Sequence, residues 1–207
     1  MQYLLEHQGQ LYGFVLFFTM FLVALFEGIS PRRAYLMPLG QRWLLHIGVA
    51  ILNVALVRFI FPVMPVLLAL YCQQSGWGLF NSLFDAPVLA FMVCLPLLDF
   101  SGWLQHWLLH HVPLLWRLHM VHHSDPDYDF TTGLRFHPLE ACFTWIMDAA
   151  VIMALGPPPL AVLVYKVVQA SFASFGHGNI RIPGAVDAIL RRLVVTPDLH
   201  RIHHSAL

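Results

Sequence analysis

The chain has 207 residues and a formal net charge of zero; apolar residues make up 58% of it and charged residues 11%. Typical water-soluble domains contain about 25% charged residues, so this chain has too little polar surface to cover a soluble fold. The balanced charge also lacks the basic excess that a nucleic-acid partner favours. We therefore expect an integral membrane protein that does not bind nucleic acid.

Three apolar segments in the first half are long enough to cross a bilayer as helices, since a span needs about 17–25 apolar residues. They cover residues 11–29, 43–61 and 87–103. Residues 30–42 form a loop with Arg32, Arg33 and Arg42, and such arginines mark the cytoplasmic side of a membrane. Glu27, near the end of the first segment, is expected to face lipid headgroups or a partner helix.

A polar segment, residues 104–140, separates these spans from two shorter apolar arms, residues 141–155 and 160–175, which a GPPP turn joins. Each arm is shorter than an ordinary span, and Lys166 interrupts the second. We therefore expect a helical hairpin that enters the membrane and returns to the same side, or that crosses fully where the local bilayer is thin. The polar segment and residues 176–207 then share the cytoplasmic side.

These segments predict an all-α integral membrane fold. It has about three transmembrane helices, the membrane-entering hairpin and a cytosol-facing, histidine-rich helical cap. We expect residues 1–207 to form a single domain, with the histidine-rich part at residues 95–207.

Histidine is concentrated in the second half, because all but two of the 13 histidines follow residue 105. Eight of them form three spaced clusters: His106 and His110; His119, His122 and His123; and His200, His203 and His204. Residues three or four positions apart lie on one face of a helix, so each cluster directs imidazoles to a common spot. The HxxHH pattern occurs twice, which chance seldom provides.

These eight imidazoles, with His137 and His177 raising the supply to ten, suit two metal ions of four to six ligands each. Nitrogen ligands alone fit iron, zinc, copper and nickel. Zinc prefers small four-coordinate sites, so a set this large favours iron with dioxygen between two ions. His7 and His46 belong to no spaced set, and His111 points about 100° away from its cluster on a helix, so we expect these three to be structural.

Five sequence segments contain or flank the clusters: DFSGWLQHWLLH at residue 99, PLLWRLHMVHHS at 113, DYDFTTGLRFHPLE at 127, FGHGN at 175 and TPDLHRIHHS at 196. In combination they resemble the fatty acid hydroxylase superfamily, also called the sterol desaturase family. The resemblance covers residues 95–207, and the segments are similar to those of bacterial members. It implies a helical membrane fold whose cytosol-facing cap holds a di-metal site.

The resemblance also implies the reaction and its participants. It implies a non-haem di-iron oxidoreductase that uses O2 and two electrons to hydroxylate, desaturate or cleave a lipid such as a fatty acyl, sterol-like or carotenoid-like chain. By position, the implied metal ligands are His106, His110, His119, His122, His123, His177, His200, His203 and His204, with His137 as a tenth. The implied cofactors are two iron ions, with zinc as a substitute.

The expected partners are a lipid substrate, the membrane and a separate electron donor, which is a reductase, a ferredoxin or a small haem protein. The expected location is a bacterial inner membrane with the histidines facing the cytoplasm. Metal-bound histidines also need a hydrogen-bond partner on the second ring nitrogen. The candidates are Asp99, Asp125, Asp127, Asp129, Glu140, Asn179 and Asp198.

Two alternative functions would also explain the histidine clusters by metal binding, but without oxidation of a lipid. One is a non-catalytic or zinc-binding membrane relative, and the other is a histidine-lined metal transporter, which would place its ligands along a path across the bilayer. Family members usually continue past the last HHS with a segment that closes the cap, whereas this chain stops at Leu207. Either the chain is a fragment or its site is less enclosed, and the zinc-binding alternative stays open.

Overall fold

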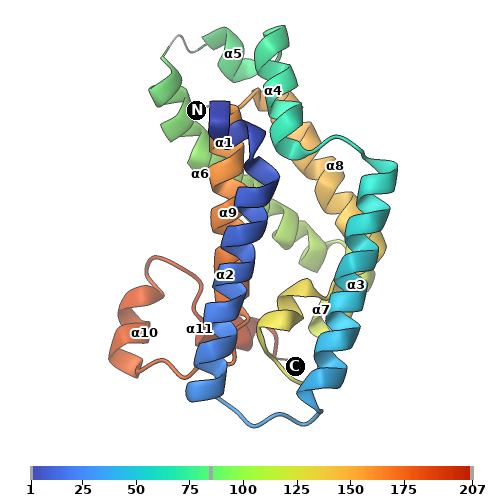
Figure 1. The fold of residues 1–207 in the computed structure, drawn as a ribbon, viewed down its shortest axis with the longest axis vertical. Coiled ribbons are helices and arrows are strands. Elements are labelled where there is room, and N and C mark those ends of the chain that lie inside the picture. Colours follow the sequence, from blue (N-terminus) through green and yellow to red (C-terminus); the bar gives the residue numbers. More distant parts are fainter. Residues whose placement is uncertain (1, 84–85, 206–207) are drawn as a thin grey trace.

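The computed structural model describes residues 2–83 and 86–205 and is a bundle of helices, most of which run roughly along the longest axis of the molecule (Figure 1). Five helical segments are long and apolar enough to cross a membrane: Gln8–Ile29, Leu39–Leu83, Pro87–His111, Pro138–Leu155 and Pro159–Gly176. The described residues form no β-strand, only one isolated bridge between Pro31 and Ile180. The predicted all-α membrane fold is confirmed.

The helices fall into two sets. The long ones are α2 (Gln8–Ile29), α3 (Leu39–Ile60), α6 (Pro87–His111), α8 (Pro138–Leu155) and α9 (Pro159–Gly176). The short ones are α1 (Gln2–Glu6), α4 (Pro65–Ser75), α5 (Leu79–Leu83), α7 (Pro113–His123), the 3-10 turn η1 (Phe130–Leu134), α10 (Gly184–Leu190) and α11 (Pro197–His203). α7, η1 and α11 gather at one end of the bundle, where the histidine-rich segments lie (Figure 1).

Proline and glycine set the ends of the hairpin that α8 and α9 form. Pro138 and Pro159 begin the two helices, a position at which the missing N–H of proline costs no hydrogen bond. α8 ends at Gly156, whose φ of 62° lies in the left-handed region that glycine adopts without strain. The two helices then run in opposite directions, so the hairpin returns to the histidine-rich end (Figure 1).

α9 lies at the centre of the bundle, in contact with α2, α4, α6, η1 and α11. Its Ala161 and Val162 are buried in the main apolar core beside Cys72 of α4 and Cys94 of α6. The outer faces stay apolar as well, and Phe17 of α2 is 73% exposed. Apolar surface on this scale fits contact with lipid chains and not with water.

One charged pair lies between the two arms of the hairpin. Lys166 Nζ of α9 is 2.5 Å from Asp148 Oδ2 of α8, and Gln105 Nε2 of α6 donates to the other carboxylate oxygen at 3.2 Å. Ionisable residues in membrane helices usually face the bundle interior and pair with one another. The pair therefore ties α6, α8 and α9 together next to the residue that begins the histidine clusters, His106.

The end of α2 is fixed to the histidine-rich end of the molecule by a buried carboxylate. Glu27 is only 4% exposed, and its Oε1 accepts the backbone N–H groups of Phe130 at 2.9 Å and Asn179 at 2.7 Å. Glu27 is expected from the sequence to face lipid headgroups or a partner helix; it is buried instead against η1 and the segment after α9. This contact anchors η1 and the segment after α9 to the same helix end.

The structure corrects the placement of Arg42 in a cytoplasmic loop. The loop ends earlier, at Pro38, and Arg42 lies in the first turns of α3 with 1% of its surface exposed. Its guanidinium is surrounded by the carboxylates of Asp125, Asp127 and Asp129. These aspartates are more than 80 residues away in the chain, so hydropathy around Arg42 carries no trace of them.

Candidate metal centre

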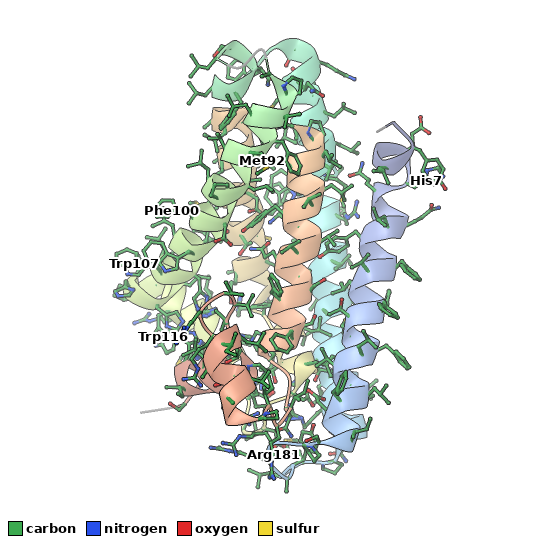
Figure 2. All side chains as sticks on the ribbon, turned by 90° about the vertical axis from the view of Figure 1, so that its left-hand side faces the viewer. His7, Met92, Phe100, Trp107, Trp116 and Arg181 are labelled. Carbon is green, nitrogen blue, oxygen red and sulfur yellow. The ribbon has the colours of Figure 1, made fainter. Side chains whose placement is uncertain are left out.

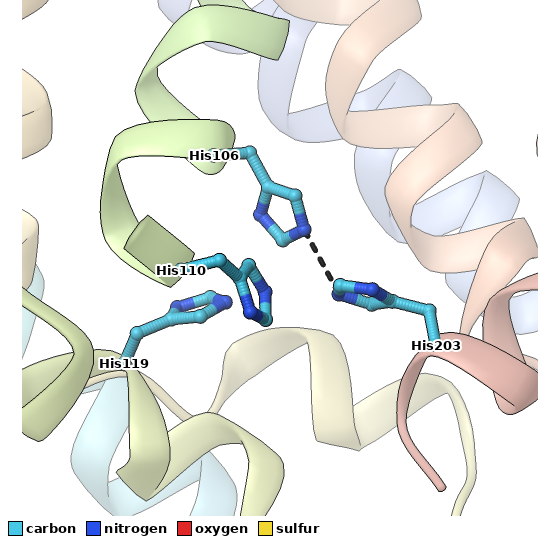
Figure 3. Close-up of side chains that lie close together, drawn as sticks. All are labelled: His106, His110, His119 and His203. Atoms are coloured by element: carbon cyan, nitrogen blue, oxygen red, sulfur yellow. Dashed lines mark hydrogen bonds between the residues drawn. The ribbon is translucent and has the colours of Figure 1, made fainter. Parts of the chain in front are cut away.

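Nine histidines converge at the end of the bundle where α6, α7, α9 and α11 meet. The residues are His106 and His110 of α6, His119, His122 and His123 of α7, His177 just after α9, His200 and His203 of α11, and His204 at its end. Figure 3 shows four of them, with the imidazoles of His106, His110, His119 and His203 pointing toward one another from three helices. The structure thus brings together nine of the ten predicted ligands.

Eight of the nine form two groups, in each of which one ring nitrogen of every histidine lies within 4.8 Å of those of the others. The first group is His106, His110, His119 and His203, and the second is His122, His177, His200 and His204. His123 forms a third set with His203 and His204, and so it lies between the two groups. Two neighbouring four-histidine groups with one histidine between them match the demand of two metal ions.

Each of the two helices with an HxxHH pattern, α7 and α11, supplies histidines to both groups. On α7, His119 faces the first group while His122, three residues later, faces the second. On α11, His203 faces the first group and His200 faces the second. Each of these helices therefore supplies both groups from a single face, which an HxxHH spacing makes geometrically available.

Short distances between ring nitrogens show where the groups are centred. The Nε2 atoms of His106 and His203 are 2.9 Å apart. In the second group, His177 Nε2 is 3.1 Å from His122 Nε2 and 3.0 Å from His200 Nε2. The Nε2 side of these rings is thus directed inward.

The outward nitrogen of three rings has a partner that fixes the ring. His119 Nδ1 is 2.7 Å from Glu140 Oε1, and His122 Nδ1 donates to the carbonyl oxygen of Thr132 at 3.1 Å. His177 Nδ1 donates to the carbonyl oxygen of Ala173 at 2.7 Å. Because Nδ1 carries the hydrogen, Nε2 has a free lone pair that faces the group, which is the tautomer that metal-bound histidines use.

Glu140 is among the partners expected from the sequence, but the aspartates are not used in this way. Asp125, Asp127 and Asp129 surround Arg42, and Asp198 pairs with Arg32. Backbone carbonyls serve His122 and His177 instead. Every residue has a backbone carbonyl group, so the residue types in the sequence could not identify these two partners.

Burial favours the neutral form of several of these imidazoles. It is the main cause that lowers the pKa of His123 to about 3 and that of His177 to about 4. Burial, followed by the neighbouring imidazoles, also lowers the pKa of His122, His200 and His204. A neutral imidazole is the form that binds a metal ion.

The metal-free protein should lose stability as the pH falls from about 6.5, the ordinary pKa of histidine, toward about 4. In this window the unfolded chain binds protons that the folded histidines do not bind. Each such group therefore removes about 1.4 kcal/mol of unfolding free energy per pH unit. Thermal unfolding in detergent measures this loss, and a His177→Phe variant should show a shallower decline. A midpoint that does not change across this pH range would contradict the expectation.

Four buried ring nitrogens without a hydrogen-bond partner are a second indication that the site binds metal ions. The Nε2 atoms of His110, His119, His123 and His204 are buried and have no hydrogen-bond partner. A buried polar atom without a partner costs about 1–3 kcal/mol. Bound metal ions would satisfy these nitrogens, so the residues present suit a metal centre.

The remaining histidines lie outside the groups. His137 is at the start of α8, where its Nδ1 accepts the backbone N–H of Leu139 at 3.1 Å. His46 is buried with its Nδ1 2.8 Å from Thr131 Oγ1. His7 and His111 each hydrogen-bond a carbonyl oxygen four residues earlier in the chain. The structure therefore does not bring the tenth predicted ligand, His137, to the other nine.

The fold and the site define an integral membrane protein with a histidine centre suited to two metal ions. The model of the fatty acid hydroxylase family matches residues 91–207, and the chain belongs to that family.

Several characterised relatives are similar to this chain over part of its length. An alkylglycerol monooxygenase of Caenorhabditis elegans is 31% identical over 133 residues, which is 63% of this chain and 25% of the relative. The human alkylglycerol monooxygenase is 32% identical over 63% of this chain and 28% of the relative. The ornithine lipid hydroxylase OlsE of Rhizobium tropici is 32% identical over 58% of this chain and 36% of the relative.

The chain thus spans about a quarter to a third of the length of these relatives. No solved structure matches it.

Proposed function

We propose that this chain is a membrane-bound non-haem di-iron oxidoreductase that uses O2 to hydroxylate or desaturate a lipid. The observation that carries the proposal is the pair of adjoining four-histidine groups, with His123 between them, at one end of a membrane bundle. When bound there, two iron ions would supply the redox chemistry needed to oxidise an unactivated C–H bond with O2. The nine histidines that would hold them are those of the two groups and His123.

The protein's own residues would supply position and exclusion of water. Glu140, Thr132 and Ala173 hold the outward nitrogens of three rings, so the inward nitrogens keep fixed directions. Burial lowers the pKa of His122, His177 and His200 and so favours the neutral form that binds a metal ion. It would also keep the reacting carbon away from solvent. For each hydroxylation, one oxygen atom of O2 enters the lipid and the other leaves as water, which takes up two protons and two electrons from a separate donor.

The lipid substrate is proposed to enter sideways from the bilayer. Met92, Phe100 and Trp107 project from the outer side of α6, the helix that carries His106 and His110 (Figure 2). These three side chains are 63%, 56% and 41% exposed, so they offer apolar contact to a lipid chain beside the centre. The names of the relatives, alkylglycerol monooxygenase and ornithine lipid hydroxylase, support a lipid as substrate class.

The proposed setting is a bacterial inner membrane with the histidine groups on the cytoplasmic side. Arg32, Arg33 and Arg181 lie at the histidine-rich end, beside the bridge between Pro31 and Ile180. Positive charge next to spans favours the cytoplasmic side. A cytoplasmic reductase, ferredoxin or small haem protein could then reach the centre.

The experiment that tests the function combines lipid analysis with metal analysis. Lipid extracts of cells with and without the gene are compared by mass spectrometry. A lipid that gains one oxygen atom or loses two hydrogens only when the gene is present is the expected result. Protein purified without oxygen should carry two iron ions per chain.

The alternatives give different results in the same experiment. One tightly bound zinc ion with unchanged lipids would support the non-catalytic zinc-binding relative. Changed metal uptake with unchanged lipids would support a transporter. Against a transporter, the short helices α7 and α11, which carry the two HxxHH clusters, lie toward the same end of the bundle (Figure 1). Either result would overturn the proposed function.

A further inference from the structure

A cluster of buried charges lies beside the histidine groups without belonging to them. The guanidinium of Arg42 makes a two-pronged contact with Asp125, with N–O distances of 2.9 and 3.1 Å. It also lies 3.3 Å from a carboxylate oxygen of Asp127 and 3.3 Å from one of Asp129. All four side chains are at most 4% exposed. Arg42 contacts all three carboxylates, whereas a second cation, Arg135, lies 3.9 Å from Asp125 Oδ1.

The same carboxylates hold the short turn η1. Asp129 accepts hydrogen bonds from the backbone N–H and the hydroxyl group of Thr131. Thr132 Oγ1 donates to Asp125 Oδ2 at 2.7 Å and accepts the backbone N–H of Asp129 at 3.1 Å. Both threonines are completely buried. The backbone of the turn is therefore fixed by the charge cluster through both of its threonines.

This turn touches the second histidine group. The carbonyl oxygen of Thr132 accepts the hydrogen bond from His122 Nδ1 at 3.1 Å. The next residue, Gly133, packs so closely on His177 that an added Cβ would lie 3.0 Å from its Nδ1. Within the described part of the chain, no hydrogen bond joins the turn to the first group, whose His119 is held by Glu140 instead.

We propose that Arg42 is a positioning residue for the second histidine group. It neutralises the carboxylates that hold η1, and η1 presents the Thr132 carbonyl that fixes the tautomer and direction of His122. This inference rests on the proposed function, since it assumes that each histidine group binds an ion. Loss of Arg42 would leave Asp127 and Asp129 without their cation and Asp125 with only the more distant Arg135. The mutual repulsion of these buried carboxylates would displace the turn.

The test is metal binding by an Arg42→Met variant, with Co²⁺ alone as the probe. Metal-free protein in detergent is equilibrated with buffered Co²⁺, and bound ions per chain are counted. Disturbed hydrogen-bond partners of metal ligands typically weaken binding by about 10–100-fold. We expect one of the two ions to bind about 10–100-fold more weakly in Arg42→Met and the other to bind as in the wild type.

Second substitutions identify the weakened ion. Adding His200→Ala, which removes a ligand of the second group, should cause little further loss in the Arg42→Met background. Adding His110→Ala should remove the ion that remains. Two changes that act on the same ion are non-additive, whereas changes that act on different ions add.

A matched control separates positioning from general destabilisation. Lys166→Met removes a cation from another internal carboxylate, Asp148, but leaves η1 untouched. It should lower the thermal midpoint and leave both Co²⁺ affinities unchanged. Should Arg42→Met fail to fold, a Thr132→Val variant keeps a similar shape but removes both hydrogen bonds of the Thr132 hydroxyl group, the one to Asp125 and the one from the backbone N–H of Asp129. It should weaken the same ion several-fold.

Different outcomes would overturn the positioning role of Arg42 and the proposed function. Wild-type protein that binds two ions, with Arg42→Met and Thr132→Val doing so at unchanged affinity, would overturn the positioning role alone. Parallel weakening of both ions would overturn it as well. Wild-type protein that takes up fewer than two ions would overturn the proposed function itself.

Discussion

Replacing His122 by alanine is expected to reduce lipid oxidation by more than about 100-fold, because even loss of a ligand's hydrogen-bond partner weakens metal sites by roughly 10–100-fold. His122 is 2% exposed, and its Nε2 lies 3.1 Å from that of His177. Its removal leaves the second group with three imidazoles. Iron analysis of the anaerobically purified variant should find about one ion fewer per chain, and the oxidised lipid should disappear from cell extracts.

His111→Ala is the matched control for this substitution. His111 follows His110 directly on α6, but its Nδ1 donates to the carbonyl oxygen of Trp107 and the residue is exposed. Its removal should leave iron content and lipid products unchanged. Equal losses in His111→Ala and His122→Ala would mean that the histidine groups are not the metal centre.

Glu140→Gln is expected to weaken the ion of the first group by about 10–100-fold while the ion of the second group keeps its affinity. Glu140 is 2% exposed, and its carboxylate lies 2.7 Å from His119 Nδ1. Glutamine keeps the shape but removes the negative charge, so the imidazole becomes a poorer electron donor to a metal ion. Co²⁺ titration of the metal-free variant measures both affinities.

The control for Glu140→Gln is Asp148→Asn, which neutralises a carboxylate on the same helix, α8, that contacts Lys166 and not a histidine. It should leave both affinities unchanged. If Glu140→Gln weakens the second ion as much as the first, Glu140 does not act through His119 alone. The two variants Glu140→Gln and Arg42→Met should therefore weaken different ions.

The parts of the site that could be predicted are those that depend on local helix geometry. His119, His122 and His123 share one face of a single helix, and their spacing in the sequence already fixes this. The division of the two HxxHH clusters between two groups could not be predicted. It depends on how α7 and α11 are placed relative to α6 and α9, which tertiary packing decides.

Tertiary packing also explains why the predicted placement of Arg42 in a cytoplasmic loop was wrong. A positive residue between two apolar segments usually marks a loop on the cytoplasmic side. Here the compensating carboxylates come from residues 125–129, so the arginine is buried with its partners. For His137, a family pattern was not sufficient to predict its place. The pattern predicted a metal ligand, whereas the structure places His137 at the beginning of α8, where its Nδ1 accepts the backbone N–H of Leu139.

Because α11 supplies histidines to both groups, its position in the chain decides when the two groups can be completed during synthesis. α11 follows all five apolar spans in the chain and supplies His203 to the first group and His200 to the second. Both groups therefore remain incomplete until α11, which follows every apolar span in the chain, has been synthesised. A partly made chain that lacks α11 holds no complete set of four imidazoles.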